Sequence, residues 1–227
     1  MKIFGHRGAA GLKDENTLAS VTEALQYKVT GIEIDVHRCK SGELIVIHDE
    51  TVDRTTDQTG VVQEMTFDQL QQCKTPNGHA IPTLQQIVSI SKGRCVLNIE
   101  LKGKDTAKPV VSLIQKYVRS THLWNYTNIL ISSFDHHMLH KVRQIDNEIA
   151  IGVLTETDIG ESISTAEQLN ARAIHPSIAL LNPDEVSKAK RLELDINVWT
   201  VNTREQFEYC KDLGVTSVIT DFPNLFV

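Results

Sequence analysis

Two short segments of the sequence place acidic side chains at every second position. In "IEIDV", Glu33 and Asp35 alternate with apolar residues, and in "NIELK", Glu100 and Lys102 have the same spacing. Residues two apart on a β-strand point to the same face, so we expect the three carboxylates to project toward one region. Like charges held together are unfavourable unless a positive partner joins them. Because the three side chains offer only oxygen ligands, the pattern predicts a divalent cation, Mg²⁺ or Ca²⁺ rather than Zn²⁺.

Two histidines follow other apolar segments. His6 stands in "FGHRG" and His48 in "VIHD", both at the point where a buried strand is expected to end. Two histidines beside a cation suit general acid–base catalysis, in which one deprotonates the attacking hydroxyl and the other protonates the leaving alkoxide. Arg7 and Lys102 add positive charges that can bind phosphate oxygens. Together these residue types predict the cleavage of a phosphodiester.

The elements that must position these residues alternate between strand and helix. Short β-branched runs and longer amphipathic segments follow each other about eight times, an order that favours parallel strands with helical crossovers. At 227 residues the expected fold is a closed (β/α)₈ barrel of the α/β class, with functional residues after the strands. We expect strands at 2–6, 31–36, 43–48, 95–101, 128–132, 149–154, 171–175, 196–200 and 216–220, and helices at 16–29, 83–92, 105–120, 135–145, 158–169, 182–193 and 203–213.

One stretch breaks this alternation. Residues 49–82 are polar and rich in turn-forming residues, and they include "DRTTDQTG". No linker rich in proline, glycine or serine divides the chain. We therefore predict a single domain over residues 1–227, with a small insertion at about 49–82 after the second strand region.

Composition narrows the classes of function. The net charge is −6 and no run of lysine and arginine occurs, which argues against a nucleic-acid partner. No stretch approaches about 18 consecutive apolar residues, so we expect no membrane span, and no secretory signal is evident. The four cysteines are widely spaced without a Cys-x-x-Cys pair, as expected of reduced thiols in a cytoplasmic protein.

The order of these motifs resembles that of one known family. The run "GHRG…ENT…EIDV…VIHD…PTL…IELK", followed by "WTVN" and "ITDFP", is similar to the glycerophosphodiester phosphodiesterases of the cytoplasmic bacterial type. The similarity extends from Phe4 to Pro223. It implies a TIM barrel that hydrolyses glycerophosphodiesters to glycerol 3-phosphate and an alcohol. It also implies one divalent cation as cofactor and a small-molecule substrate.

The resemblance further assigns roles to individual residues. It implies that His6 and His48 are the acid–base pair and that Glu33, Asp35 and Glu100 bind the metal. Arg7 and Lys102 are implied to contact the phosphate, and Glu15 and Asp49 to orient the residues that touch the substrate. Phe134 and Trp199 are placed near the barrel mouth. The two aromatic side chains are expected either to pack against the glycerol or alcohol portion or to complete the packing of the rim. His37 continues the face of Glu33 and Asp35, and we expect it at the rim.

Two alternatives stay open at this point. The same barrel could act as a lysophospholipase D or a sphingomyelinase D, although such substrates need a larger apolar surface than the modest insertion indicates. A non-catalytic barrel that binds phosphate or a partner protein is the other alternative, since a fold alone does not establish an activity. The residues agree equally with attack by water and with attack by the glycerol 2-hydroxyl through a cyclic phosphate. They also agree with several different head-group alcohols in the substrate and with several oligomeric states of the protein.

Overall fold

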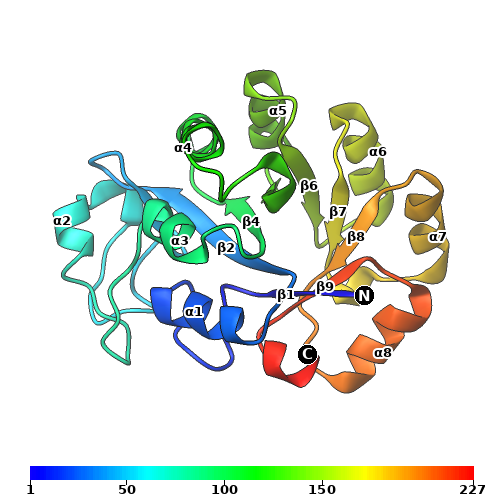
Figure 1. Ribbon diagram of the computed structural model, residues 1–227, viewed down its shortest axis with the longest axis horizontal. Coiled ribbons are helices and arrows are strands. Elements are labelled where there is room, and N and C mark those ends of the chain that lie inside the picture. The colour runs from blue at the N-terminus through cyan, green and yellow to red at the C-terminus, as the bar shows by residue number, and fades with distance from the viewer.

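Eight parallel strands close into a barrel in the computed structural model, which describes residues 1–227 (Figure 1). They are β1 (Lys2–Gly5), β2 (Gly31–Arg38), β4 (Val96–Leu101), β5 (Ile129–Ser133), β6 (Ala150–Thr155), β7 (Ala173–Pro176), β8 (Asp195–Val198) and β9 (Ser217–Thr220). Each strand pairs with the next in this order, and β1 pairs in parallel with both β2 and β9, which closes the ring. The predicted (β/α)₈ barrel is confirmed.

Seven helices lie on the outside of the strands and connect successive barrel strands (Figure 1). They are α1 (Leu18–Gln26), α3 (Leu84–Ser91), α4 (Ala107–Ser120), α5 (His136–Ile145), α6 (Ile159–Leu169), α7 (Pro183–Arg191) and α8 (Arg204–Leu213). Capping side chains fix where they begin: Thr17, Asp135 and Asn182 each accept hydrogen bonds from backbone N–H groups in the first turn. None of the helices combines the length and the apolar character that crossing a membrane requires.

The strands separate apolar from polar side chains between their two faces. On β2, Ile32, Ile34 and Val36 are fully buried in a core of 44 residues. Glu33 and Asp35 occupy the opposite face because successive strand residues alternate. Burying an isoleucine or valine side chain stabilises the fold by about 1.5–3 kcal/mol. The outer face of the barrel therefore supplies stability, and the inner face is left to carry polar groups.

A further strand, β3 (Leu44–Val46), lies outside the barrel and pairs antiparallel with the end of β2. The segment that follows contains the short helix α2 (Phe67–Leu70) and takes part in a separate core of eight buried residues. It is tied to the loop after β1 by Asp14, which accepts hydrogen bonds from Thr75 Oγ1 and from the backbone and side-chain amides of Asn77. The insertion predicted after the second strand region is thus present beside the barrel.

A buried histidine occupies the interior of the barrel. His175 on β7 is fully buried, and its Nε2 lies 2.9 Å from Nδ2 of Asn197 on β8. Burial lowers the pKa of His175 to about 3, so the ring is neutral and Nε2 accepts the amide hydrogen. Gly152 on β6 leaves space for this ring, since a Cβ built there would lie 2.3 Å from Nε2. The interior of the barrel at β6 and β7 therefore depends on a close contact between neighbouring strands.

We expect Gly152→Ala to lower the free energy of unfolding by about 1–3 kcal/mol, because a methyl group at this position overlaps the imidazole of His175. Chemical denaturation followed by circular dichroism measures this loss. In a His175→Ala background the same substitution should cost much less, since the ring is absent. Equal losses in the two backgrounds would show that the glycine is required for another reason.

Candidate active site

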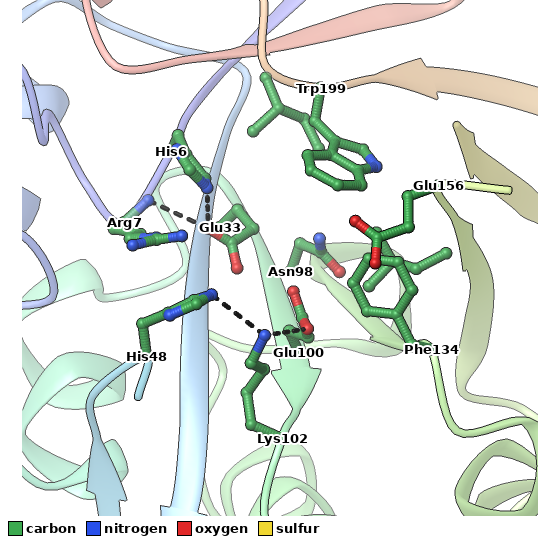
Figure 2. A pocket seen from close by; sticks show the side chains of 12 residues that line it. His6, Arg7, Glu33, His48, Asn98, Glu100, Lys102, Phe134, Glu156 and Trp199 are labelled. Carbon is green, nitrogen blue, oxygen red and sulfur yellow. Dashed lines mark hydrogen bonds and ion pairs between the residues drawn. The ribbon is translucent and has the colours of Figure 1, made fainter. Parts of the chain in front are cut away.

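A pocket of 290 Å³ opens at the end of the barrel where the carboxyl ends of the strands meet (Figure 2). Twelve residues line it. Eight of them are predicted from the sequence motifs: His6, Arg7, Glu33, His48, Glu100, Lys102, Phe134 and Trp199. The other four are Asn98, Leu154, Glu156 and Ile219. The remaining predicted residues, Glu15, Asp35 and Asp49, each contact one of the lining residues.

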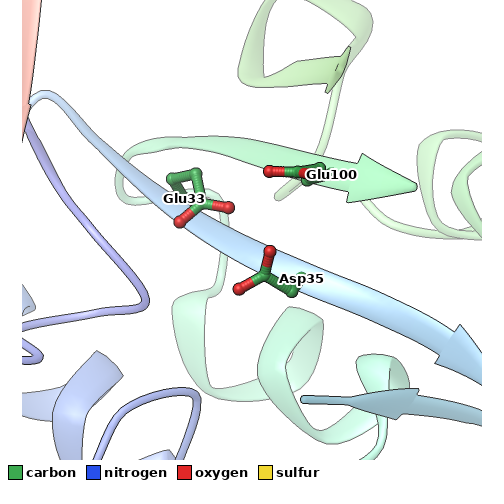
Figure 3. A group of neighbouring side chains, drawn as sticks. All are labelled: Glu33, Asp35 and Glu100. Atoms are coloured by element: carbon green, nitrogen blue, oxygen red, sulfur yellow. The ribbon is translucent and has the colours of Figure 1, made fainter. Parts of the chain in front are cut away.

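Three carboxylates meet on the inner face of β2 and β4 (Figure 3). The register of these strands places Asp35 opposite Glu100 and Glu33 opposite Asn98. One carboxylate oxygen from each of the three acidic residues lies within 4.8 Å of the others. All three residues are buried, and Glu100 is the most exposed of them at 7%. The clustering predicted from the alternation is therefore present.

This cluster needs a positive partner. Burial and the neighbouring carboxylates raise the pKa of Glu33 well above its ordinary value and raise the pKa of Glu100 to about 7. Oε1 of Glu33 is buried and has no hydrogen-bond partner. A set of oxygen ligands that includes an unpaired buried carboxylate oxygen fits a hard divalent cation. The three side chains are thus able to hold a metal ion.

The turn after β1 brings Arg7 against the cluster. Arg7 and Gly8 both have left-handed backbone conformations (φ 49° and 86°), and a Cβ on Gly8 would lie 2.5 Å from the backbone of α1. The backbone N–H of Arg7 donates to Oε2 of Glu33 at 3.0 Å. Its guanidinium group lies 2.8 Å from Glu15 and 3.4 Å from Asp35. Burial would lower the pKa of Arg7, but the neighbouring carboxylates outweigh burial and raise it, so the group stays charged.

His6 is held by an aspartate that follows the last strand. Its Nδ1 lies 2.6 Å from Oδ1 of Asp221, and Oδ2 of Asp221 accepts a hydrogen bond from Asn202 Nδ2 at 2.6 Å. Because a carboxylate only accepts, Nδ1 carries a proton, and Nε2 is the ring nitrogen that is left to exchange a proton in the pocket. Asp221 is absent from the predicted site residues, and its only signal in the sequence is a polar residue after a strand in "ITDFP".

His48 is held in the same way by its neighbour in the sequence. Its Nδ1 lies 2.6 Å from Oδ1 of Asp49, and its Nε2 lies 3.1 Å from Nζ of Lys102. Partial burial lowers the pKa of His48, and the charges of Arg7 and Lys102 act in the same direction, although nearby carboxylates oppose them. The imidazole is therefore mostly neutral at pH 7, with Nε2 able to accept a proton.

Glu15 and Asp49 are joined by Arg54, a residue of the insertion that the sequence motifs do not single out. The Arg54 guanidinium donates to Glu15 at 2.8 and 2.9 Å and to Asp49 at 2.6 and 2.9 Å. The hydrogen bonds from Arg54 hold the pKa of Asp49 well below its ordinary range. Since Glu15 also accepts from Arg7, a continuous chain of charges connects the pocket to the insertion.

Aromatic side chains form the side of the pocket away from the two histidines (Figure 2). The rings of Phe134 and Trp199 meet edge to face, with centroids 5.7 Å apart. Nζ of Lys102 lies 5.8 Å from the centroid of the Phe134 ring and 3.1 Å from Oε1 of Glu100. Both aromatic residues thus stand at the barrel mouth, where the sequence predicts them.

The prediction that His37 lies at the rim is wrong. His37 is 2% exposed, and its Nε2 lies 3.0 Å from the backbone oxygen of His48. Gly103 lies against the same ring, since a Cβ built there would be 3.0 Å from Nδ1 of His37. His37 therefore supports the backbone that carries His48 and does not line the pocket.

Comparisons with known proteins agree with this geometry. Residues 6–225 match the sequence profile of the glycerophosphoryl diester phosphodiesterase family. The chain is 31% identical over 234 residues to a glycerophosphodiester phosphodiesterase of Caldanaerobacter subterraneus, with 99% of this chain and 96% of that protein covered. A glycerophosphodiester phosphodiesterase structure from Agrobacterium tumefaciens is 30% identical with a TM-score of 0.85, covering 100% of this chain and 98% of that one. An Oleispira antarctica phosphodiesterase, solved with its product sn-glycerol-3-phosphate, has the same fold at 24% identity (TM-score 0.89, 99% and 94% covered).

The matched region includes every residue that lines the pocket. The 31% identity extends over nearly the whole length of this chain and of the relative from Caldanaerobacter. The chain belongs to the glycerophosphoryl diester phosphodiesterase family, and its enzyme class is that of the phosphoric diester hydrolases.

Proposed function

We propose that this protein hydrolyses glycerophosphodiesters to glycerol 3-phosphate and an alcohol in a metal-dependent reaction. The main support is the arrangement of two histidines, each held at Nδ1 by a carboxylate, beside a buried cluster of three carboxylates. Membership of the family supports the class of substrate. The substrate is a small molecule in this proposal, and residues 1–227 act as one catalytic domain.

Glu33, Asp35 and Glu100 are the residues that we assign to a Mg²⁺ or Ca²⁺ ion. When bound, such an ion draws negative charge from the phosphoryl oxygens and offsets the repulsion among the carboxylates. Arg7 and Lys102 contribute further positive charge at the pocket wall, where they bind the phosphate.

The two histidines move the protons of the reaction. One Nε2 removes the proton of the attacking hydroxyl, which belongs to water or to the glycerol 2-hydroxyl, as the new P–O bond forms. In the second case the product of this step is a cyclic phosphate, and water then attacks it and breaks the bond from phosphorus to the 2-oxygen to give glycerol 3-phosphate. The other histidine enters the reaction protonated at both ring nitrogens and donates the proton on its Nε2 to the oxygen of the departing alcohol as the old P–O bond breaks. Asp221 and Asp49 hold the rings in orientation and stabilise the positive charge that an imidazole acquires.

The size of the pocket supports a small diester over a lipid. Its 290 Å³ is close to the lower limit of about 300 Å³ for small-molecule sites, and only four of its lining residues are hydrophobic. The acyl chain of a lysophospholipid or a sphingomyelin needs more apolar surface than this. The four cysteines are buried and free, which supports a location in the reducing cytoplasm.

We expect EDTA to abolish the release of glycerol 3-phosphate and Mg²⁺ or Ca²⁺ to restore it, because the carboxylate cluster loses its positive partner. Glu100→Gln keeps the shape of the side chain but removes one anionic ligand, so more metal should be needed for half-maximal activity. A coupled assay titrated with each metal measures both effects, and a thermal shift on adding metal reports binding without turnover. Activity that survives exhaustive chelation would contradict the metal assignment.

We expect His6→Ala and His48→Ala each to lower kcat/KM by about 10²–10⁴, the usual contribution of a positioned proton transfer. The double variant should lose less than the product of the single losses, since the two residues act as a unit. A p-nitrophenyl diester distinguishes their roles: its leaving group needs little protonation, so only the variant that lacks the general acid is partly rescued. Near-normal rates of both single variants on a natural diester would mean that the histidines are structural.

We expect Asp221→Asn to lower kcat by about 10²–10⁴ with little change in KM, because an amide can donate to Nδ1 and so favour the wrong tautomer of His6. Steady-state kinetics on a folded variant, checked by circular dichroism, tests this. Asn202→Ala is the control, since it removes the other partner of Asp221 but leaves the carboxylate at Nδ1. An unchanged kcat in Asp221→Asn would rule out the positioning role.

A further inference from the structure

The pocket has two chemically different halves (Figure 2). The half to which we assign the phosphate carries the histidines, the basic residues and the carboxylate cluster. The other half contains the apolar residues Phe134, Leu154 and Trp199 together with a single charged residue, Glu156. No part of the reaction described above uses Glu156.

Glu156 brings an uncompensated negative charge to this half of the pocket. It follows β6, is exposed, and makes no hydrogen bond or ion pair within the protein. In Figure 2 its carboxylate lies beside the ring of Phe134 and points toward the interior of the pocket. The basic side chains that line the pocket are engaged elsewhere, since Lys102 pairs with Glu100 and Arg7 contacts other carboxylates.

The negative charge continues beyond the pocket. An adjoining hollow of 210 Å³ shares Glu156 and two apolar residues with it. Its wall adds Asp158 and Glu161 and contains no lysine or arginine, with His136 as its only basic group. A group that extends from the phosphate into this region therefore meets carboxylates on its way to solvent.

Two further features indicate that this half receives part of a ligand. Asn98 lies between the two halves in Figure 2 and is 1% exposed, and its Oδ1 has no hydrogen-bond partner. Phe134 is 38% exposed, and its ring forms part of the pocket wall next to the ring of Trp199. Tryptophan and phenylalanine faces attract cations through their π electrons, more strongly than they attract neutral polar groups.

We propose that this half of the pocket selects glycerophosphodiesters whose alcohol carries a cationic nitrogen, with Glu156 as the residue that determines the preference. The proposal rests on the proposed function, because a phosphate bound in the charged half directs the alcohol across the pocket. A choline or ethanolamine group there gains an ion pair with Glu156 and a cation–π contact with the rings. A neutral polyol such as glycerol gains neither.

The test measures glycerol 3-phosphate release from glycerophosphocholine, glycerophosphoethanolamine and glycerophosphoglycerol. We expect Glu156→Gln to lower the ratio of kcat/KM for either cationic diester to that for glycerophosphoglycerol by up to about fivefold, the effect of losing one exposed ion pair while the aromatic contacts remain. Glu156→Lys, which places a positive charge at the same position, should lower this ratio further.

Glu167→Gln is the matched control, because it removes the same charge from an exposed position on α6 outside the pocket. It should leave the ratio unchanged. An equal loss for all three diesters in Glu156→Gln would overturn the proposal, since the residue then binds the glycerol portion that they share. An unchanged ratio would also overturn it.

A binding measurement separates this proposal from the proposed function. If the wild type turns over none of the three diesters, the proposed function fails, and calorimetric titration with glycerophosphocholine still tests the role of Glu156. Weaker binding to Glu156→Gln than to the wild type supports the cationic subsite. Equal binding to both proteins contradicts it.

Discussion

Three buried carboxylates held together on the inner face of the barrel are the constraint on which the rest of the site depends. Burial disfavours the charged forms of Glu33 and Glu100, and the neighbouring carboxylates add repulsion. The chain offsets this from separate loops: Arg7 approaches from the turn after β1, the Asn16 amide donates to Asp35 at 2.8 Å, and Lys102 pairs with Glu100. The positions of these loops follow from where β2 and β4 place their acids.

The two histidines are alike in geometry and different in electrostatics. Each has Nδ1 at 2.6 Å from an aspartate oxygen. Asp49 is shared with the guanidinium of Arg54, which neutralises much of its charge, whereas Asp221 shares its second oxygen with the neutral amide of Asn202. The two rings therefore sit beside carboxylates of unequal effective charge. This asymmetry suits a reaction in which one ring must accept a proton while the other gives one up.

The fold and the main site residues could be predicted because both depend on local patterns. Because side chains along β2 point alternately to the two faces of the sheet, Ile32 and Glu33 lie on opposite faces. Barrels of this kind carry polar residues at the ends of their strands. Asp221 and Arg54 escaped prediction because their partners are distant: Asp221 is 215 residues from His6, and Arg54 is 39 residues from Glu15. His37 was misplaced because the groups that lie against its ring, the backbone oxygen of His48 and the backbone at Gly103, belong to other segments, and the alternation along β2 does not reveal them.

The pairing of β1 with β9 has a consequence for the timing of synthesis. His6 emerges from the ribosome 215 residues before Asp221, which follows the strand that closes the ring. Until then β1 lacks one neighbour, and the imidazole of His6 lacks the carboxylate that orients it. A nascent or prematurely terminated chain is therefore unable to assemble the pocket, and hydrolysis begins only once the barrel has closed.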